Sequence, residues 1–371
     1  MKPVRQTWID YARGIAIILV LYRHVFEGIK NSGISIAEYL PIEHANILFF
    51  SFRMPLFFII SGFFVAGSLA KRGLKLFVNT KACLILYPYF LWGILQITIQ
   101  LVLKDYVNAN RSVYSYLDLL YMPRMIDQFW YLYALFNVSI LYVLSVVLLK
   151  FKPIYNIGLG VVFFAISVLA YQHNVNLGFI ADVLHYYLFF AIGDLMSGFV
   201  KNKMNLKYLQ SWKILLLAAV PFAFSQYYYL YINLPYAAIN YEFVEYYQPV
   251  IFIFIALTGG AFVILLSFFL QKIKAIPWLH VLGKHSLYIY VAHVMVFAAL
   301  RIFMTKVLGI YNVPLLLISG IIAGLVVPVF LFKLFVKLNM RWIFELNPPA
   351  NNKMNSDNKL YLHKKNIENI L

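Results

Sequence analysis

Long apolar stretches separated by short polar segments follow one another along the whole chain. A membrane-spanning helix needs about 20 mostly apolar residues, and ten stretches reach that length. In lipid a helix satisfies its own backbone hydrogen bonds, so these stretches predict helices rather than open strands. The ten predicted spans are residues 8–27, 46–70, 80–103, 130–149, 153–171, 178–200, 212–231, 247–270, 285–304 and 313–337.

This pattern predicts an all-α polytopic membrane protein, a bundle of about ten transmembrane helices. Residues 1–345 form one membrane domain in this interpretation. Residues 346–371 are polar, with Asn347-Pro348-Pro349 near their start. Such composition is typical of a flexible segment, here a polar cytoplasmic tail.

Composition supports a membrane protein and excludes other classes. The 371 residues are 63% hydrophobic and 12% charged, whereas a soluble domain carries about 25% charged residues. A soluble globular enzyme, a disordered chain and a fibrous repeat are therefore excluded. The net charge of +17 would suggest nucleic acid in a soluble protein. Here the basic residues lie in short loops, so we expect the lipid bilayer and no nucleic acid as a partner.

Lysine and arginine are divided unequally between the two sides of the predicted bundle. Loops and ends on the side of the N-terminus carry 21 of them, the opposite side carries 5, and 5 lie inside predicted spans. Cytoplasmic loops are enriched in these residues. We therefore expect both termini in the cytoplasm, which agrees with an even number of spans.

The first predicted span is unusually rich in ionisable residues, which mark function when they lie within a membrane. Arg13 and His24 are eleven positions apart, so on a helix they share one stripe about 16 Å apart along the axis. Arginine suits phosphate because it stays charged and bonds in a bidentate manner, and histidine suits proton transfer. In the alternative interpretation, Asp10 pairs with Arg13 and His24 extends to the headgroups.

Further basic residues lie in or beside the next two spans. Arg53 could hold a carbonyl or hydroxyl of a ligand, or pair with Glu27 or Glu43. A cluster of basic residues where the second predicted span ends and the third begins could receive phosphates, mark topology or bind anionic lipid. The cluster comprises Lys71, Arg72, Lys75 and Lys81.

The span 285–304 carries a polar stripe. Ser286, Tyr290 and His293 are spaced by four and three residues, so they share one helical face. We expect that face to point into the bundle and to meet the first helix, although His293 also fits a plain buried histidine. The histidines are scattered and have no cysteine partners, so no metal site is expected.

In these segments the chain resembles the acyltransferase type 3 family of bacterial integral membrane proteins. The likeness covers roughly residues 5–340 and follows the family's order. Its features are Trp8-Ile9-Asp10-Tyr11-Ala12-Arg13-Gly14-Ile15-Ala16 followed by His24, Met54-Pro55-Leu56-Phe57-Phe58 through Ser61-Gly62-Phe63-Phe64, Trp130-Tyr131-Leu132, and Gly283 with Ser286, Tyr290 and His293.

The resemblance implies an enzyme of the bacterial plasma membrane that transfers an acyl group, usually acetyl from acetyl-CoA, to a hydroxyl of a cell-surface carbohydrate. It implies that Arg13 and His24 are essential. On this basis we expect His24 to act as general base or transient acyl carrier, with Glu27 orienting it. Arg53 or Tyr290 would stabilise the oxyanion, and His293 completes the candidate site. We expect Arg13, Arg72, Lys75 and Lys81 to hold acetyl-CoA.

Two departures from the family pattern concern these assignments. Many members have histidine where this chain has Arg53, and some have a denser arginine cluster where it offers mainly Lys81. The segment from Lys81 through Pro88-Tyr89 to Trp92 is more similar to the stand-alone sugar O-acetyltransferases. Some relatives carry an added esterase-like domain, for which the short tail leaves no room.

Two other functions also fit a ten-helix bundle with proline-containing spans. A transporter or flippase for a lipid-linked or anionic glycan is one, although transporters often show inverted repeats and no repeat is visible here. A structural subunit of an envelope complex is the other, and it would tolerate neutral replacements of all intramembrane charges.

Overall fold

The computed structural model describes residues 7–237 and 241–346, and within them every regular element is helical. Nine helical segments there have the length and hydropathy to cross a membrane. The protein is therefore a multi-span membrane protein. The segments are α2–α3 (Leu40–Leu48 and Phe50–Gly62), α4–α5 (Val65–Lys81 and Tyr87–Val102, joined by the π-helical turn Ala82–Leu86), α7 (Trp130–Leu148), α8 (Pro153–Gln172), α9 (Phe179–Lys201), α11 (Trp212–Asn233), α13 (Pro249–Ile273), α15 (Ser286–Ile302 with the π-helical turn Phe303–Val307) and α16 (Val313–Lys337).

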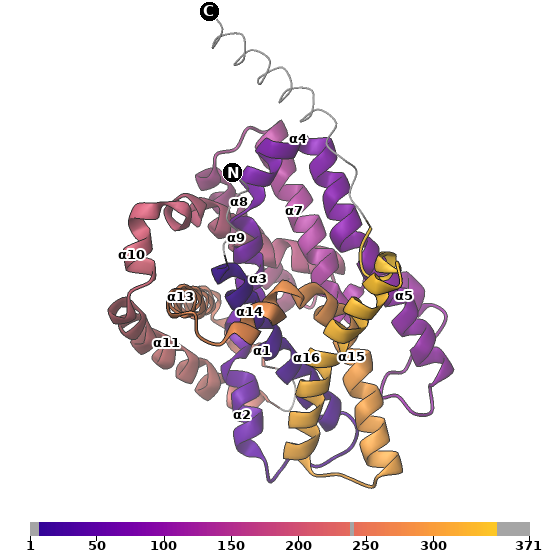
Figure 1. Ribbon diagram of the computed structural model, residues 1–371. Helices are drawn as coiled ribbons and strands as arrows, with labels where there is room; N and C mark the ends of the chain where they lie inside the picture. The colour runs from indigo at the N-terminus through magenta and orange to yellow at the C-terminus, as the bar shows by residue number, and fades with distance from the viewer. Residues whose placement is uncertain (1–6, 238–240, 347–371) are drawn as a thin grey trace, which may run out of the picture.

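Helix α1 (Trp8–Lys30) corresponds to the first predicted span but is too charged to be among these nine. Its 23 residues give a length of about 34 Å. It lies in the middle of the bundle and packs against α3, α13, α15 and α16 (Figure 1). Protein therefore surrounds much of this helix, which explains how it can carry charged side chains.

Most predicted spans agree with the observed helices within three residues, but the region 63–79 was predicted wrongly. The span 46–70 ends as a helix at Gly62, and the predicted loop 71–79 is part of α4. The charged side chains there suggested a loop, whereas a helix can continue beyond the hydrocarbon with its charges in water. Gly73, with φ of 69°, kinks α4.

The predicted loop 271–284 also contains a helix, α14 (Pro277–Lys284), which packs across the N-terminal half of α1. Gly14 and Gly283 allow this close crossing. A Cβ on Gly283 would lie 1.6 Å from the Asp10 carbonyl oxygen, and one on Gly14 would lie 2.3 Å from that of Leu279. An ion pair between His280 and Asp10 (Nε2–Oδ2 3.2 Å) joins the same two helices.

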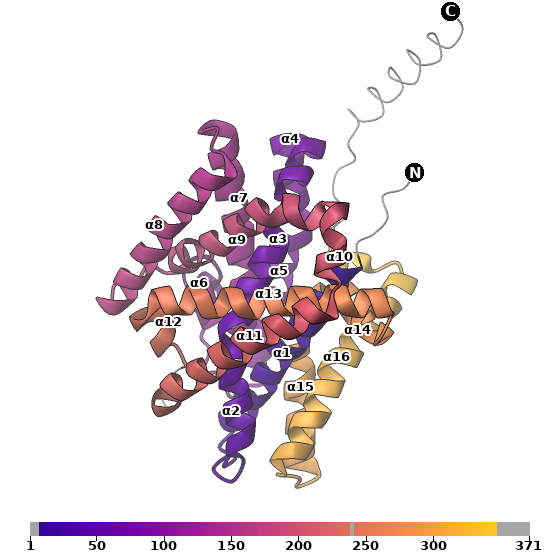
Figure 2. The same ribbon diagram turned by 90° about the vertical axis from the view of Figure 1, so that its left-hand side faces the viewer.

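Glycines produce a second close crossing, between α3 and α9. A Cβ on Gly62 or on Gly193 would lie 2.1 Å from the carbonyl oxygen of Phe190 or of Ile59, respectively. The small pair Ser61-Gly62 thus permits close packing of these two helices. Figure 2 shows α13 running across α1 and α3, both of which it contacts. These crossings fix α1, α3 and α13 around the region described next.

Three further short helices lie in the polar connections. They are α6 (Ser115–Tyr121), α10 (Leu206–Leu209) and α12 (Phe243–Tyr247). The predicted loop 104–129 thus includes α6, and Arg111 and Asp127 form an ion pair there (2.9 Å). The predicted tail lies outside the described residues, apart from Leu346.

Candidate active site

A cavity of about 460 Å³ opens beside the N-terminal half of α1. We call it the inner cavity, because it lies at the end of α1 that was predicted to be cytoplasmic. Arg13, Arg72 and Lys81 supply its positive charges, and no acidic residue lines it within the described part of the chain. Its walls come from α1, α3, α4, α7 and α15. Three of the four predicted acetyl-CoA residues therefore meet here.

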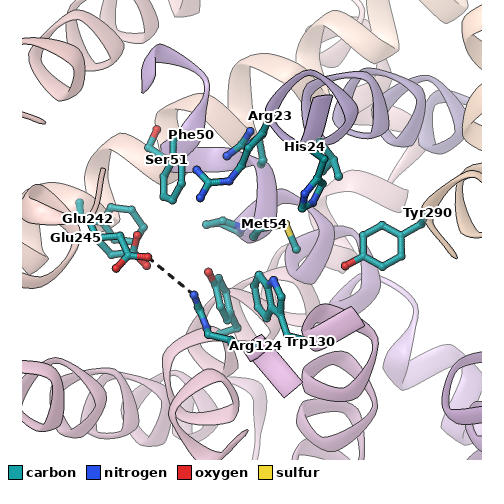
Figure 3. A pocket seen from close by; sticks show the side chains of 15 residues that line it. Arg23, His24, Phe50, Ser51, Met54, Arg124, Trp130, Glu242, Glu245 and Tyr290 are labelled. Atoms are coloured by element: carbon teal, nitrogen blue, oxygen red, sulfur yellow. Dashed lines mark ion pairs between the residues drawn. The ribbon is translucent and has the colours of Figure 1, made fainter. Parts of the chain in front are cut away.

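A smaller cavity of about 80 Å³, the outer cavity, lies beside the C-terminal half of α1. Figure 3 shows the side chains that surround it, with Arg23 and His24 coming from the same helix. Its lining is much more polar than a core pocket. The charged and aromatic members of that lining are Arg23, His24, Phe50, Arg53, Arg124, Trp130, Tyr186, Glu242, Glu245, Phe252 and Tyr290.

Tyr290 lines both cavities and therefore forms part of the wall between them. Its side chain is buried, and its hydroxyl donates a hydrogen bond to the carbonyl of Gln128. In this structure that hydroxyl is engaged with the backbone. Arg13 borders the inner cavity and His24 the outer one, so the two predicted ends of the reaction path lie on either side of one phenol ring.

His24 lies beside His293, as expected from the polar stripe of α15. Their ring centroids are 5.2 Å apart. His293 Nδ1 is 2.8 Å from the carbonyl oxygen of Tyr290, which can only accept, so Nδ1 carries the proton. The buried Nε2 has no hydrogen-bond partner among the described residues. This nitrogen can therefore accept a hydrogen bond in the neighbourhood of His24.

The remaining predicted residues are less closely joined to His24. Glu27 Oε1 accepts a hydrogen bond from Asn46 (3.2 Å) rather than from the imidazole. Glu27 and His24 also border a separate cavity of about 330 Å³ between α1, α5 and α15. Arg53 is buried and donates to the carbonyl of Leu19 (3.1 Å). Lys75 is exposed and borders neither the inner nor the outer cavity.

A fourth compartment, the vestibule, adjoins the outer cavity. It has a volume of about 490 Å³ and shares Arg124 and Glu242 with the outer cavity. Arg124 forms ion pairs with Asp182 (2.7 Å) and with Glu242 (3.9 Å), the latter drawn in Figure 3. Arg124 and Glu242 of this ionic group border both compartments.

Burial and neighbouring charges shift the pKa values of Glu242 and Arg124. Burial and the nearby Glu245 raise the pKa of Glu242 above its ordinary value of 4.5, while Arg124 and Arg23 act in the opposite direction. Burial opposes the charge of Arg124, but Asp182, Tyr246, Tyr186 and Glu242 together outweigh it and raise the arginine's pKa well above its usual range. Arg124 is therefore a permanent cation, and Glu242 is the group of this boundary that titrates more readily.

Sequence reasoning missed Arg124, Glu242 and Glu245 as residues of the site. A usable signal was present: the chain has only 14 acidic residues, and two of them stand three positions apart directly before the span that begins near Pro249. Arg23 lies within the first predicted span and was given no role there. All four residues border the outer cavity.

Comparison with known proteins gives one match over nearly the whole chain. Residues 6–333 match the family described as an acyltransferase domain. The nodulation protein NolL of Sinorhizobium fredii (strain NBRC 101917 / NGR234) is 22% identical over 201 residues, which is 54% of this chain and 51% of that protein. The chain thus aligns with about half the length of this relative. No solved structure matches the chain.

Proposed function

Since this chain belongs to the acyltransferase domain family, we propose that it is a membrane O-acyltransferase that moves an acetyl group from acetyl-CoA to a hydroxyl of a cell-surface carbohydrate. One observation carries the proposal. The inner cavity with Arg13 and the outer cavity with His24 share Tyr290 as a wall, so a donor and an acceptor can approach one point from opposite ends of α1.

The inner cavity suits the donor. Coenzyme A carries several phosphate charges, and the described lining offers Arg13, Arg72 and Lys81 with no acidic residue. Guanidinium groups bind phosphate in a bidentate manner. We place this cavity at the cytoplasmic face of the bacterial plasma membrane, where acyl-CoA is available, with both termini on the same side. The excess of basic residues in the loops of that side supports the orientation.

His24 is the proposed general base. It takes the proton of the acceptor hydroxyl as the oxygen attacks the thioester carbonyl, and a tetrahedral oxyanion forms. The C–S bond then breaks, the acetyl ester leaves on the acceptor, and the coenzyme A thiolate takes the proton back from His24. His293 Nε2 can position the protonated imidazole. Arg53, which is buried beside the outer cavity, is the proposed stabiliser of the oxyanion.

The test is a transfer assay with the purified protein in lipid vesicles. Wild type should consume acetyl-CoA and acetylate a carbohydrate acceptor, and mass analysis should find acetyl ester in the product. His24→Ala should lose about 10²–10⁴-fold in rate, the usual contribution of general-base catalysis. Thermal unfolding compares the fold of the variant with that of wild type. A folded His24→Ala protein with full transfer activity would refute the proposed base.

A further inference from the structure

Not every cation that borders the outer cavity forms an ion pair within the described residues. Three acidic residues lie there or directly behind it, and each lies close to a basic side chain. Asp182 and Glu242 pair with Arg124 (2.7 and 3.9 Å), and Glu245 pairs with His185 (2.9 Å). Arg23 and Arg53 form no ion pair within residues 7–237 and 241–346. Two guanidinium groups therefore border the cavity without a carboxylate of their own.

Arg23 is the less satisfied of the two. Its guanidinium lies over the rings of Phe50 and Tyr241, 4.5 and 5.6 Å from their centroids. Its Nη1 is buried without a hydrogen-bond partner among the described residues. Residues 238–240, which lie outside the described part of the chain, are Ala, Ile and Asn, so none of them is acidic. A buried charge without a partner is costly, so a ligand that supplies an anion at this point binds with a large gain.

The size of the cavity restricts that anion. A volume of about 80 Å³ holds several water molecules, since one water needs roughly 10–15 Å³ by the same measure. A carboxylate or phosphate group fits, whereas a whole sugar ring does not. The adjoining vestibule of about 490 Å³ has room for the rest of an acceptor. Its polar lining includes Ser167, Asn174 and Asn176.

We propose that the carbohydrate acceptor is acidic, and that its carboxylate or phosphate group binds Arg23 in the outer cavity while its ring lies in the vestibule. This inference rests on the proposed function, since it names the acceptor of that reaction. Coenzyme A is the other possible source of an anion. The inner cavity already offers Arg13, Arg72 and Lys81 to its phosphates, so Arg23 is free for the acceptor.

The first experiment measures binding without catalysis. Inorganic phosphate is titrated into the detergent-solubilised protein by calorimetry in the presence of saturating coenzyme A, which fills the inner cavity. Wild type should bind phosphate, and Arg23→Gln should bind it about tenfold more weakly or worse, the usual value of a charged hydrogen bond. Arg23→Lys keeps the charge and should bind with intermediate affinity. Lys306→Gln removes an exposed lysine far along α15 and should bind as wild type does.

The second experiment compares methyl glucuronide with methyl glucoside as acetyl acceptors; they differ only at C6, which is a carboxylate in the first and a hydroxymethyl group in the second. Wild type should prefer the glucuronide, and Arg23→Gln should lose the preference while its KM for acetyl-CoA stays unchanged. Equal phosphate binding by wild type and Arg23→Gln would overturn the inference, as would the absence of phosphate binding by wild type when coenzyme A is saturating. Absence of transfer to both sugars, with coenzyme A and phosphate still bound, would instead refute the proposed function.

Discussion

The inner and outer cavities lie along one helix but differ in size and in charge. The inner cavity is about 460 Å³ and is lined by cations without acids among the described residues. The outer cavity is about 80 Å³ and combines arginines with Glu242 and Glu245. A wide, uniformly positive cavity accepts a large polyanion with little demand on shape. A narrow cavity of mixed charge admits few groups, so selectivity is expected to lie on the outer side.

The largest expected effect comes from disrupting the packing of α14 against the N-terminal half of α1. Gly283→Ala places a methyl group 1.6 Å from the Asp10 carbonyl oxygen, and the backbones of α14 and α1 must separate. We expect a loss of about 3 kcal/mol or more in the free energy of unfolding, measured by thermal or denaturant unfolding. Gly67→Ala is the control, because its methyl group would meet nothing within 4 Å. Equal stability of the two variants would contradict the close crossing.

The next largest effect tests whether the inner and outer cavities bind different ligands. Arg72→Gln and Lys81→Gln each remove a cation of the inner cavity, and each should raise the KM for acetyl-CoA about tenfold, or about 1.4 kcal/mol. The KM for the acceptor should not change. Lys75→Gln is the matched control from the same helix, since its exposed side chain borders neither cavity. A similar rise in all three variants would show a general charge effect rather than a donor site.

A smaller effect is expected at the shared wall. Tyr290→Phe keeps the ring between the cavities and removes only the hydrogen bond to Gln128, so we expect transfer to fall about fivefold, near 1 kcal/mol. Tyr290→Ala opens the wall, and hydrolysis of acetyl-CoA should then rise relative to transfer. Both rates are read from thiol release with and without acceptor. An unchanged ratio in Tyr290→Ala would mean that the ring does not separate the two ligands.

The smallest effect concerns pH. The raised pKa of Glu242 means that the folded protein holds this proton at a pH where the unfolded chain has released it. Folded stability should therefore fall as the pH rises above 4.5 through the raised value, by at most about 1.4 kcal/mol for each pKa unit of displacement. Glu242→Gln should remove this decline. Unfolding midpoints from pH 4.5 to 7 test it, and parallel curves for the two proteins would contradict the shift.

The sequence predicted the membrane helices well because their apolar length is a direct physical requirement of lipid. The bounds of α8, α9 and α16 were within one residue. The region of α4 was missed because a charged segment is compatible with both a loop and a helix outside the hydrocarbon. Only the packing of neighbouring helices distinguishes those two cases.

The candidate site was predicted in part. The helical stripe placed Arg13 and His24 correctly on one side of α1, since that relation depends only on local geometry. The polar face of α15 was expected to meet α1, and His293 of that face lies beside His24, with ring centroids 5.2 Å apart. Arg124, Glu242 and Glu245 come from connections between helices, and no periodicity relates such residues to α1. These three residues line the outer cavity only because of the tertiary packing of the helices.

The central position of α1 has a consequence for biosynthesis. This helix leaves the ribosome first, yet it packs against α13, α14, α15 and α16, which are made last. Until they appear, the contact between Asp10 and His280 of α14 cannot form, and the faces of α1 that these helices cover lack their protein neighbours, which disfavours release into lipid. We therefore expect the insertion machinery to retain this segment until these helices are made, and a chain truncated before Pro277 to be degraded rather than embedded.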